Sequence, residues 1–245
     1  LSKIILCSLY KKLKLDFYTA HDTIIEMQPM QSRTKPPSWW KEIKNSFDQF
    51  RSRVGVTVPT PTIKTCPGVV DYIRKPMTLK LWSDVIFKVK ANGDVEAIEP
   101  IHNAGIIDGA MHHSEQYGDT LYPGRTVFKL HGPWAVKANF PGEYMITECH
   151  YSEDLRKHSI LISPGISNFN LQHTLNAFLV FPIKDEDYTV TLKYGTPIMS
   201  LYPMHDRKFE VKMHKTDRKG FSDIQSVFPS TFIGRYYTGK HALKD

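Results

Sequence analysis

The sequence lacks the motifs by which the common catalytic classes are recognised. It contains no G-x-S-x-G, no P-loop and no G-x-G-x-x-G, so hydrolase, NTPase and dinucleotide-binding functions have no support. Cysteine is scarce, because Cys7, Cys66 and Cys149 lie far apart with no C-x-x-C pair, and neither a zinc ribbon nor a disulfide framework is indicated. No apolar run approaches the ~20 residues of a membrane-spanning helix. We therefore expect a protein without a membrane span that folds in a reducing, intracellular setting.

Charge of one sign is concentrated at the two ends of the chain. The formal net charge is +7. Residues 1–14 carry four lysines and no acid, and residues 205–245 carry nine basic and five acidic residues. The region between the ends is therefore nearly neutral. Basic ends on a neutral body are typical of solvated tails, whereas nucleic-acid binding requires a basic face with interleaved aromatics, so a nucleic-acid partner is not expected.

Many short elements are indicated by 16 prolines and 14 glycines spread along the 245 residues. About ten short segments with strand-like alternation, separated by turns, predict a mainly β (α+β) fold, an antiparallel β-sandwich or open barrel. We expect residues 1–15 to form a frayed or amphipathic leader, residues 16–213 a single β-rich domain, and residues 214–245 a polar C-terminal tail. The tail would pack on the domain or on a partner.

Two short helices are predicted near the N-terminus. Ser38 is a suitable N-cap for a helix over Trp39–Phe50, in which Trp40, Ile43, Phe47 and Phe50 share one face. The second helix spans Pro67–Arg74 and ends before Pro76. Between them, Gly55–Pro61 is predicted to be extended, and its two prolines confine it to an edge or a connection.

The strongest strand pattern lies between Phe178 and Pro203. Two apolar runs, Phe178–Ile183 and Tyr188–Tyr194, flank the polar segment 184–187, a lysine followed by three acidic residues, and this arrangement predicts a hairpin. A third run, Ile198–Tyr202, follows the break at residues 195–197. Elsewhere the patterns predict a long strand over residues 79–89, a hairpin turn at Asn92-Gly93, and irregular structure over residues 102–125 and 151–158. Strands are expected at 126–130 and 134–138, joined by a turn at residues 131–133.

Histidines provide the most suggestive chemical pattern. On an extended segment, His113 and Glu115 would point to the same face. With His205 as third ligand, or His173 in its place, they could form the two-His-one-carboxylate triad of non-haem Fe(II) oxygenases. Such a triad leaves positions open for oxygen and substrate. The alternative is solvated loop histidines, because eleven histidines in this chain produce an H-x-E by chance.

Aromatic residues suggest a contact surface. Trp39 and the pair Tyr236 and Tyr237 are candidates for binding a partner, a sugar or a small molecule. Trp40 and Trp82 occupy apolar-face positions, which favour core packing.

Adjacent polar pairs are weaker candidates. His21-Asp22 and His205-Asp206 would face opposite ways on a strand, which favours surface positions over acid–base pairs. Cys149 is interpreted as a small core residue. Cys66 precedes a predicted helix, where a thiol pKa can be lowered, but a buried structural role is favoured.

A series of short motifs runs through roughly residues 16–213. In chain order they are Phe17-Tyr18, PPSWW at Pro36–Trp40, TIKTCPGVVDY at Thr62–Tyr72, LKLWSD at Leu79–Asp84, Gly132–Trp134 with Pro141–Tyr144, and Phe181-Pro182 with YGTPIMSLYP at Tyr194–Pro203. In this order the motifs resemble an uncharacterised family of marine-phage and bacterial β-rich proteins of about this length. The resemblance implies a lineage and a β-rich fold, and no reaction.

The leading functional hypothesis is a non-catalytic phage-type protein that binds a protein partner or assembles as a homo-oligomer. The alternatives are the Fe(II)-dependent oxygenase and a small-molecule or glycan-binding sandwich. No cofactor is predicted outside the oxygenase alternative. The expected location is the cytoplasm of a bacterial or phage-infected cell, with virion association as the alternative.

Overall fold

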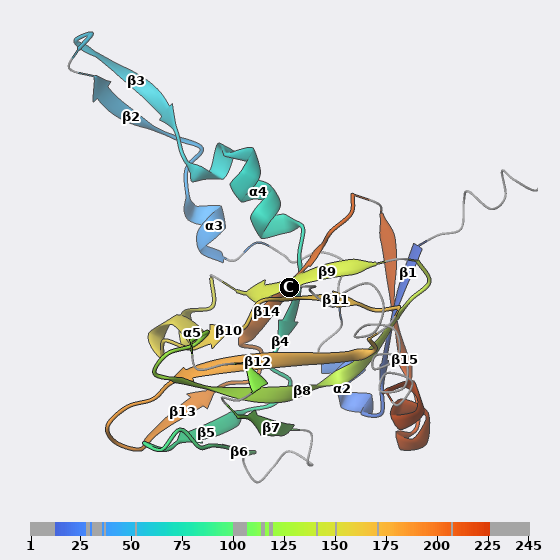
Figure 1. Ribbon diagram of the computed structural model, residues 1–245. Coiled ribbons are helices and arrows are strands. Elements are labelled where there is room, and N and C mark those ends of the chain that lie inside the picture. The colour runs from blue at the N-terminus through green and yellow to red at the C-terminus, as the bar shows by residue number, and fades with distance from the viewer. Residues whose placement is uncertain are drawn as a thin grey trace, which may run out of the picture.

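The computed structural model describes residues 13–27, 30, 36, 38–51, 53–99, 107–113, 116–117, 120–140, 142–149, 151–170, 172–206 and 208–225. Strands dominate the body, and helices are few and short (Figure 1). The expected mainly β sandwich is therefore confirmed, with more helices than the two that were predicted.

The large sheet has six strands in the order β10-β12-β8-β1-β15, and β7 pairs with β8 beside this path. β1 and β15 are parallel, and the other neighbours are antiparallel. Its strands are β1 (Leu13–Thr19), β7 (Asp108–His112), β8 (Arg125–Ala138), β10 (Leu161–Ile162), β12 (Thr174–Pro182) and β15 (Phe209–Lys215).

Two smaller antiparallel sheets pack against the inner face of the large sheet. The four-stranded sheet has the order β11-β9-β14-β4, and the three-stranded sheet has the order β13-β5-β6. Their strands are β4 (Met77–Lys80), β5 (Val85–Val89), β6 (Val95–Ile98), β9 (Glu143–Glu148), β11 (Gly165–Asn168), β13 (Tyr188–Leu192) and β14 (Pro197–Pro203).

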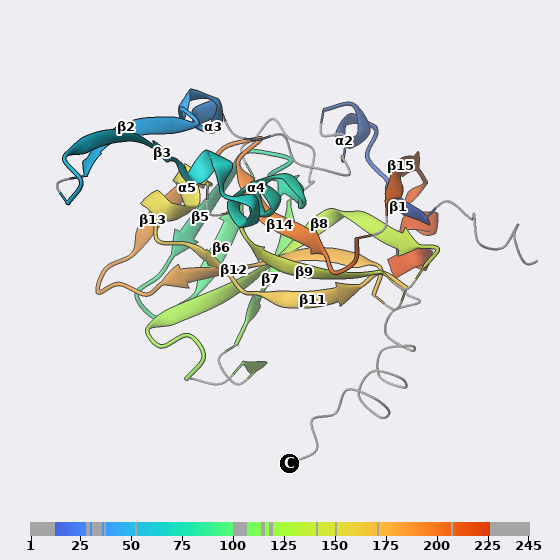
Figure 2. The same ribbon diagram turned by 90° about the horizontal axis from the view of Figure 1, so that it is seen from above.

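A hairpin projects from this body. Strands β2 (Ser46–Arg51) and β3 (Val56–Pro61) pair only with each other among the described strands. Figures 1 and 2 show this hairpin pointing away from the sheets, with α3 (Ser38–Glu42) and α4 (Pro67–Arg74) at its base. We call residues 46–61 the hairpin arm. The other helical segments are α2 (Asp22–Met27), a 3-10 turn (Ile63–Thr65), α5 (Glu153–Lys157) and residues 218–225.

The core forms where the inner faces of the three sheets meet. Phe17 on β1 packs edge-on against Trp134 on β8, with ring centroids 5.8 Å apart. Phe87 of the three-stranded sheet contacts Phe128 and Phe181 of the large sheet at 5.6 and 5.0 Å. All of these rings are buried, and each contributes about 1.5–3 kcal/mol by leaving water. Aromatic contacts therefore join the two layers.

A bulge at Gly132-Pro133 divides β8 into two halves. Asn176 of β12 pairs with His131, but Thr174 pairs with Ala135, so β8 has extra residues between these pairs. A Cβ atom on Gly132 would lie 1.9 Å from the carbonyl oxygen of Leu175, so only glycine allows this approach. The bulge also accommodates Pro133, which cannot donate to a ladder.

Several local predictions are confirmed. Helix α4 has the predicted bounds. Asn92-Gly93 forms the turn between β5 and β6, and Gly93 has a φ of +91°. The extended segment ending at Pro61 is β3, a strand with a single partner among the described residues.

The predicted helix over Trp39–Phe50 is wrong beyond Glu42, because residues 46–51 form strand β2. The chain reverses at residues 53–55, where Gly55 has a φ of +65°. Pairing with β3 then satisfies the backbone of β2. Phe47 and Phe50, which a helix would place on one face, lie on opposite faces of the hairpin and are both exposed.

The predicted hairpin between residues 178 and 203 is also wrong, although all three runs are strands. β12 belongs to the large sheet, β13 to the three-stranded sheet and β14 to the four-stranded sheet. The connection crosses between layers, and the Tyr188 hydroxyl donates to the carbonyl of Pro182 at 2.6 Å. The apolar runs identified three strands, but such a pattern does not specify which strand lies beside each of them.

Four further segments differ from expectation. Residues 131–133 form no turn, because β8 continues through the bulge. The predicted long strand at 79–89 is broken at residues 81–84 into β4 and β5. The segment 102–125 contains β7, and the segment 151–158 contains α5.

The expected leader and tail lie largely outside the described residues. β1 already begins at Leu13, inside the expected leader, and the ordered chain continues beyond residue 213 through β15 and the 218–225 helix. None of the described helices combines the length and the apolar character that a membrane span requires.

Replacing Gly132 by alanine should destabilise the fold by about 1–3 kcal/mol or more, because the new methyl group overlaps the Leu175 carbonyl. Urea denaturation measures the change. The control is Gly165→Ala, another strand glycine whose added Cβ meets nothing within 4 Å; this variant should stay within about 0.5 kcal/mol of the parent. Equal stability of the two variants would contradict the role of the bulge.

Candidate functional site

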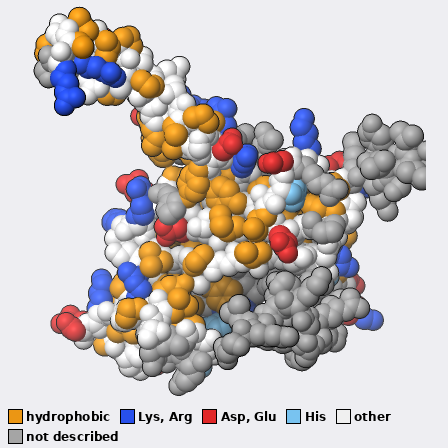
Figure 3. Space-filling view, turned by 45° about the horizontal axis from the view of Figure 1, so that its top comes forward, with side chains coloured by type: hydrophobic (Ala, Val, Ile, Leu, Met, Phe, Trp, Pro, Cys, Tyr) orange, Lys and Arg blue, Asp and Glu red, His pale blue; other side chains and the backbone are white. Residues whose placement is uncertain are grey.

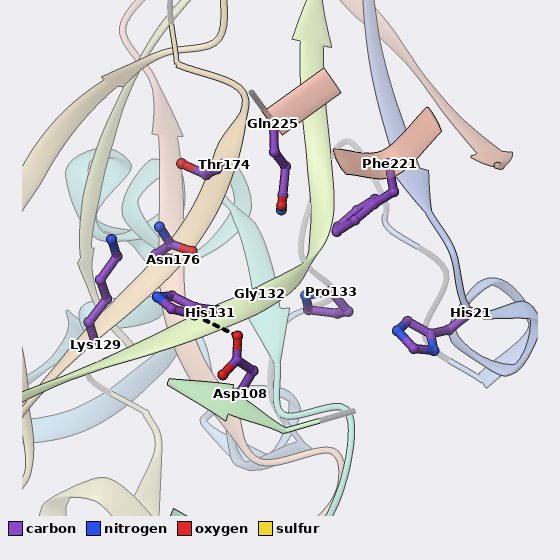
Figure 4. A pocket seen from close by; sticks show the side chains of 10 residues that line it. All are labelled: His21, Asp108, Lys129, His131, Gly132, Pro133, Thr174, Asn176, Phe221 and Gln225. Atoms are coloured by element: carbon purple, nitrogen blue, oxygen red, sulfur yellow. Dashed lines mark hydrogen bonds and ion pairs between the residues drawn. The ribbon is translucent and has the colours of Figure 1, made fainter. Parts of the chain in front are cut away.

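A cavity of about 320 Å³ lies against the outer face of the large sheet. Strands β7, β8 and β12 supply Asp108, Lys129, His131 and Asn176. His21 comes from the segment before α2, and the 218–225 helix contributes Phe221 and Gln225. Figure 4 shows Phe221 and Gln225 extending from their helix toward these strands. The volume is at the lower end of the range for small-molecule sites.

Strand register places the polar residues in rows. Asp108, His131 and Asn176 are direct neighbours across β7, β8 and β12. In the next row on the same face, Lys129 lies between Ala110 and Phe178. Since alternate residues of a strand share a face, Lys129 and His131 project together toward the cavity.

His131 is oriented by a carboxylate. Its Nδ1 atom lies 2.8 Å from Oδ2 of Asp108, and Figure 4 shows this contact inside the cavity. Such a pair fixes the orientation of the imidazole and leaves the other ring nitrogen for a ligand or a proton. Thr174 supplies the only hydroxyl group among the lining residues. The arrangement suits binding and proton exchange better than nucleophilic attack.

Lys129 is half-buried over the ring of Phe178, with its Nζ 5.9 Å from the ring centroid. Burial lowers the pKa of Lys129 below its ordinary value. His112, which meets the same ring edge-on at 5.1 Å, also has a lowered pKa, first through burial and then through the nearby Lys129, His131 and His113. The cavity is therefore bordered by one cation, Lys129, that lacks full hydration, and His112 lies beside the same phenylalanine ring.

The hairpin arm is the second candidate. Every residue of β2 is exposed, and Phe50 and Val54 keep 65% and 64% of their surfaces accessible. Trp39 and Ile63 at the base of the arm are exposed as well. In Figure 3 apolar side chains continue from the arm down to the body. Exposed apolar residues gathered on one element indicate a contact surface.

The two edges of the arm differ in their hydrogen-bonding capacity. Backbone bonds from Thr62 to Asn45 and from Gly55 to Arg51, both 3.0 Å, fix the alternation of the ladder. In this alternation the backbone nitrogens of Pro59 and Pro61 point away from β2. Proline has no N–H group, so the outer edge of β3 lacks a hydrogen-bond donor at both positions. β2 has no proline and can accept a further strand.

The residues predicted to bind Fe(II) are not assembled by the described part of the chain. His113 is exposed just after β7. His173 is buried, with its Nδ1 atom 2.9 Å from the carbonyl of Val136, and His205 lies against the rings of Phe140 and Tyr144. Across the described residues, no three His, Cys, Asp or Glu side chains are grouped to hold a metal. Glu115 lies outside these residues, so the Fe(II) site stays a prediction.

The aromatic and cysteine expectations have mixed outcomes. Trp39 is exposed at the base of the arm, and Trp40 and Trp82 are buried as expected. Tyr236 and Tyr237 lie outside the described residues. Cys149 is a core residue, but the buried role favoured for Cys66 is wrong, because this side chain is exposed where α4 begins.

Sequence reasoning missed the cavity. Asp108 was assigned to irregular structure and His131 to a turn, so their pairing across β7 and β8 could not be foreseen. The available signal was the alternation Lys129-Leu130-His131, which places the lysine and the histidine on one face of a strand. The turn predicted at residues 131–133 ends the strand before His131, so the face that Lys129 and His131 share was not recognised.

No protein-family model and no curated protein matches this sequence. The resemblance to the marine-phage family therefore stays an expectation.

The two described cysteines should differ sharply in reactivity. Burial raises the pKa of Cys149 to about 12, so at pH 8 only about one thiol in ten thousand is ionised. In a Cys7→Ser background, an aromatic disulfide reagent should modify Cys66 quickly and Cys149 only after denaturation. Cys66→Ser is the matched control and should leave no reactive thiol in the native protein. Rapid labelling of that variant would contradict the burial of Cys149.

Proposed function

We propose that this protein is a non-catalytic assembly protein, in which the hairpin arm of one copy docks on the body of a second copy. The observation that carries the proposal is an arm that buries none of the side chains of β2 and carries exposed phenylalanines on both faces. An isolated two-stranded hairpin is marginally stable in water. Contact with a second surface would therefore stabilise it.

The body offers a matching surface on the outer face of the four-stranded sheet. Met145 of β9 and Ile166 of β11 are cross-strand neighbours, and both are exposed. Met204, which follows β14, is exposed too, and its N–H bonds the carbonyl of Glu143 on β9. We call Met145, Ile166 and Met204 the docking face. β11 is also the last strand of its sheet among the described residues, so its outer edge can pair with β2 of an arriving arm.

Charge favours contact between the arm and this face. Residues 39–66 contain five basic and two acidic residues, a net charge of +3. Glu143 projects on the same side of β9 as Met145 and is exposed. Figure 3 shows basic side chains toward the tip of the arm and acidic ones around the apolar area of the body. Opposite charges orient the two surfaces and speed their encounter.

Docking of an arm on a different surface is a head-to-tail contact. Such contacts generate rings when the rotation closes and filaments when it does not. The second copy is favoured as occupant because one chain carries both complementary surfaces. If the arm bound a different protein, the docking face would not take part in the assembly.

Arm and face variants test the assembly. Phe47→Ser with Phe50→Ser, and separately Ile166→Lys, should each convert the wild-type oligomer into a monomer in light scattering coupled to gel filtration. These side chains are exposed, so folding should be preserved. Leu121→Ser is the control, since Leu121 is an equally exposed apolar residue that belongs neither to the arm nor to the docking face, and this variant should assemble normally.

Mixing the variants gives a sharper result. The arm variant keeps an intact docking face, and the face variant keeps an intact arm, so an equimolar mixture should form heterodimers. Arm-to-arm pairing predicts no such recovery. A wild-type protein that stays monomeric at all attainable concentrations would refute assembly through copies of this chain.

A further inference from the structure

We propose that the cavity on the outer face of the large sheet binds a small organic anion, with a carboxylate or phosphate group held by Lys129 and Asn176. The apolar part of the ligand would lie against Phe221 and Pro133. This site is separate from the hairpin arm and from the docking face, and it does not depend on the proposed assembly.

The first observation is that Lys129 is a half-buried cation on the wall of the cavity. Lys129 lies between Ala110 and Phe178 in its row, and within the described residues its ammonium group forms no ion pair with a carboxylate. A cation withdrawn from water in this way is stabilised by an anion. The lowered pKa of Lys129 has the same physical origin, namely incomplete hydration of the ammonium group.

A second lysine on the same strand shows the contrast. Lys137 also lies over an aromatic ring, with its Nζ 5.7 Å from the centroid of Tyr18. Its cross-strand neighbour is Asp16, whose Oδ1 atom lies 2.8 Å from Nε2 of His214, so this carboxylate contacts an imidazole and also lies at the position opposite Lys137. Two lysines of β8 thus have the same ring contact, but only Lys137 has a carboxylate at the opposed position.

The remaining lining groups fit one end of an anion. Asn176 and Gln225 bring amide donors and Thr174 a hydroxyl, all of which line the cavity. The carboxylate of Asp108 already accepts from His131 at 2.8 Å, so the acidic group of the cavity is engaged. A protonated His131 would add a further donor to the ligand.

The wall opposite these donors is apolar. Phe221 and Pro133 border the cavity, and Figure 4 shows the ring of Phe221 directed toward Pro133. A planar ring or short hydrocarbon fits such a wall, whereas a fully hydrated inorganic ion would leave it uncovered. The geometry therefore favours an anion that carries an apolar group.

Benzoate is the main probe, with inorganic phosphate and the neutral isostere benzamide for comparison. Isothermal titration calorimetry on the full chain should detect benzoate binding and at least tenfold weaker binding of benzamide. Lys129→Met should weaken benzoate binding about tenfold or more, which corresponds to one charge-assisted hydrogen bond. Lys137→Met, the matched control, should bind benzoate like the parent.

A second variant keeps the test decisive if Lys129→Met folds poorly. Asn176→Ala removes one amide from the same row and should also weaken benzoate binding. Stronger binding of phosphate than of benzoate would refute the apolar part of the proposal. Absence of binding by either anion, or equal affinity in the Lys129→Met and Lys137→Met variants, would overturn the site.

Discussion

The close approach of Gly132 to the carbonyl of Leu175 determines how the large sheet is built. With no side chain at this position, β8 can bulge against β12 without losing its place in the sheet. Its first half then pairs with β7 and β12, and its second half pairs with β1. The same bulge lies beside the row of Asp108, His131 and Asn176, so one contact fixes both the strand order and the floor of the cavity.

The body and the arm differ in how far their apolar side chains are buried. Most strands of the body turn apolar side chains inward, and the rings of Phe17, Trp134 and Phe87 fill the space between layers. The arm has no such face, because Phe47 and Phe50 are both accessible on opposite sides. Among the described strands, β2 and β3 pair only with each other. This contrast is the reason for proposing that the arm contacts another molecule.

The sequence predicted best where a local signal was sufficient. Pro67 and Pro76 delimit α4, Asn92-Gly93 forms its turn, and alternation identified the burial of Cys149. These features depend on φ restrictions and on the period of side chains along one strand.

Prediction failed where the outcome depended on which strand a segment pairs with. Residues 46–51 have a helix-like apolar spacing, yet they pair with β3 after the reversal at Gly55. The His131-Gly132-Pro133 triplet is typical of a turn, and only the neighbouring β12 makes it a bulge. The candidate site was missed because Asp108 and His131 meet only through the pairing of β7 with β8, and neither the strand β7 nor the continuation of β8 through residues 131–133 was predicted.

The sequence by itself determined a mainly β class, the position of several strands and the course of α4, because these follow from side-chain period and backbone restriction. Only the tertiary structure decided that the strands between residues 174 and 203 belong to three different sheets, that residues 46–61 form a projecting arm, and that Lys129, His131 and Asp108 share one cavity. Which strands become neighbours depends on how the strand faces pack in the folded protein. The residue patterns of these faces are similar, so no local pattern determines the choice.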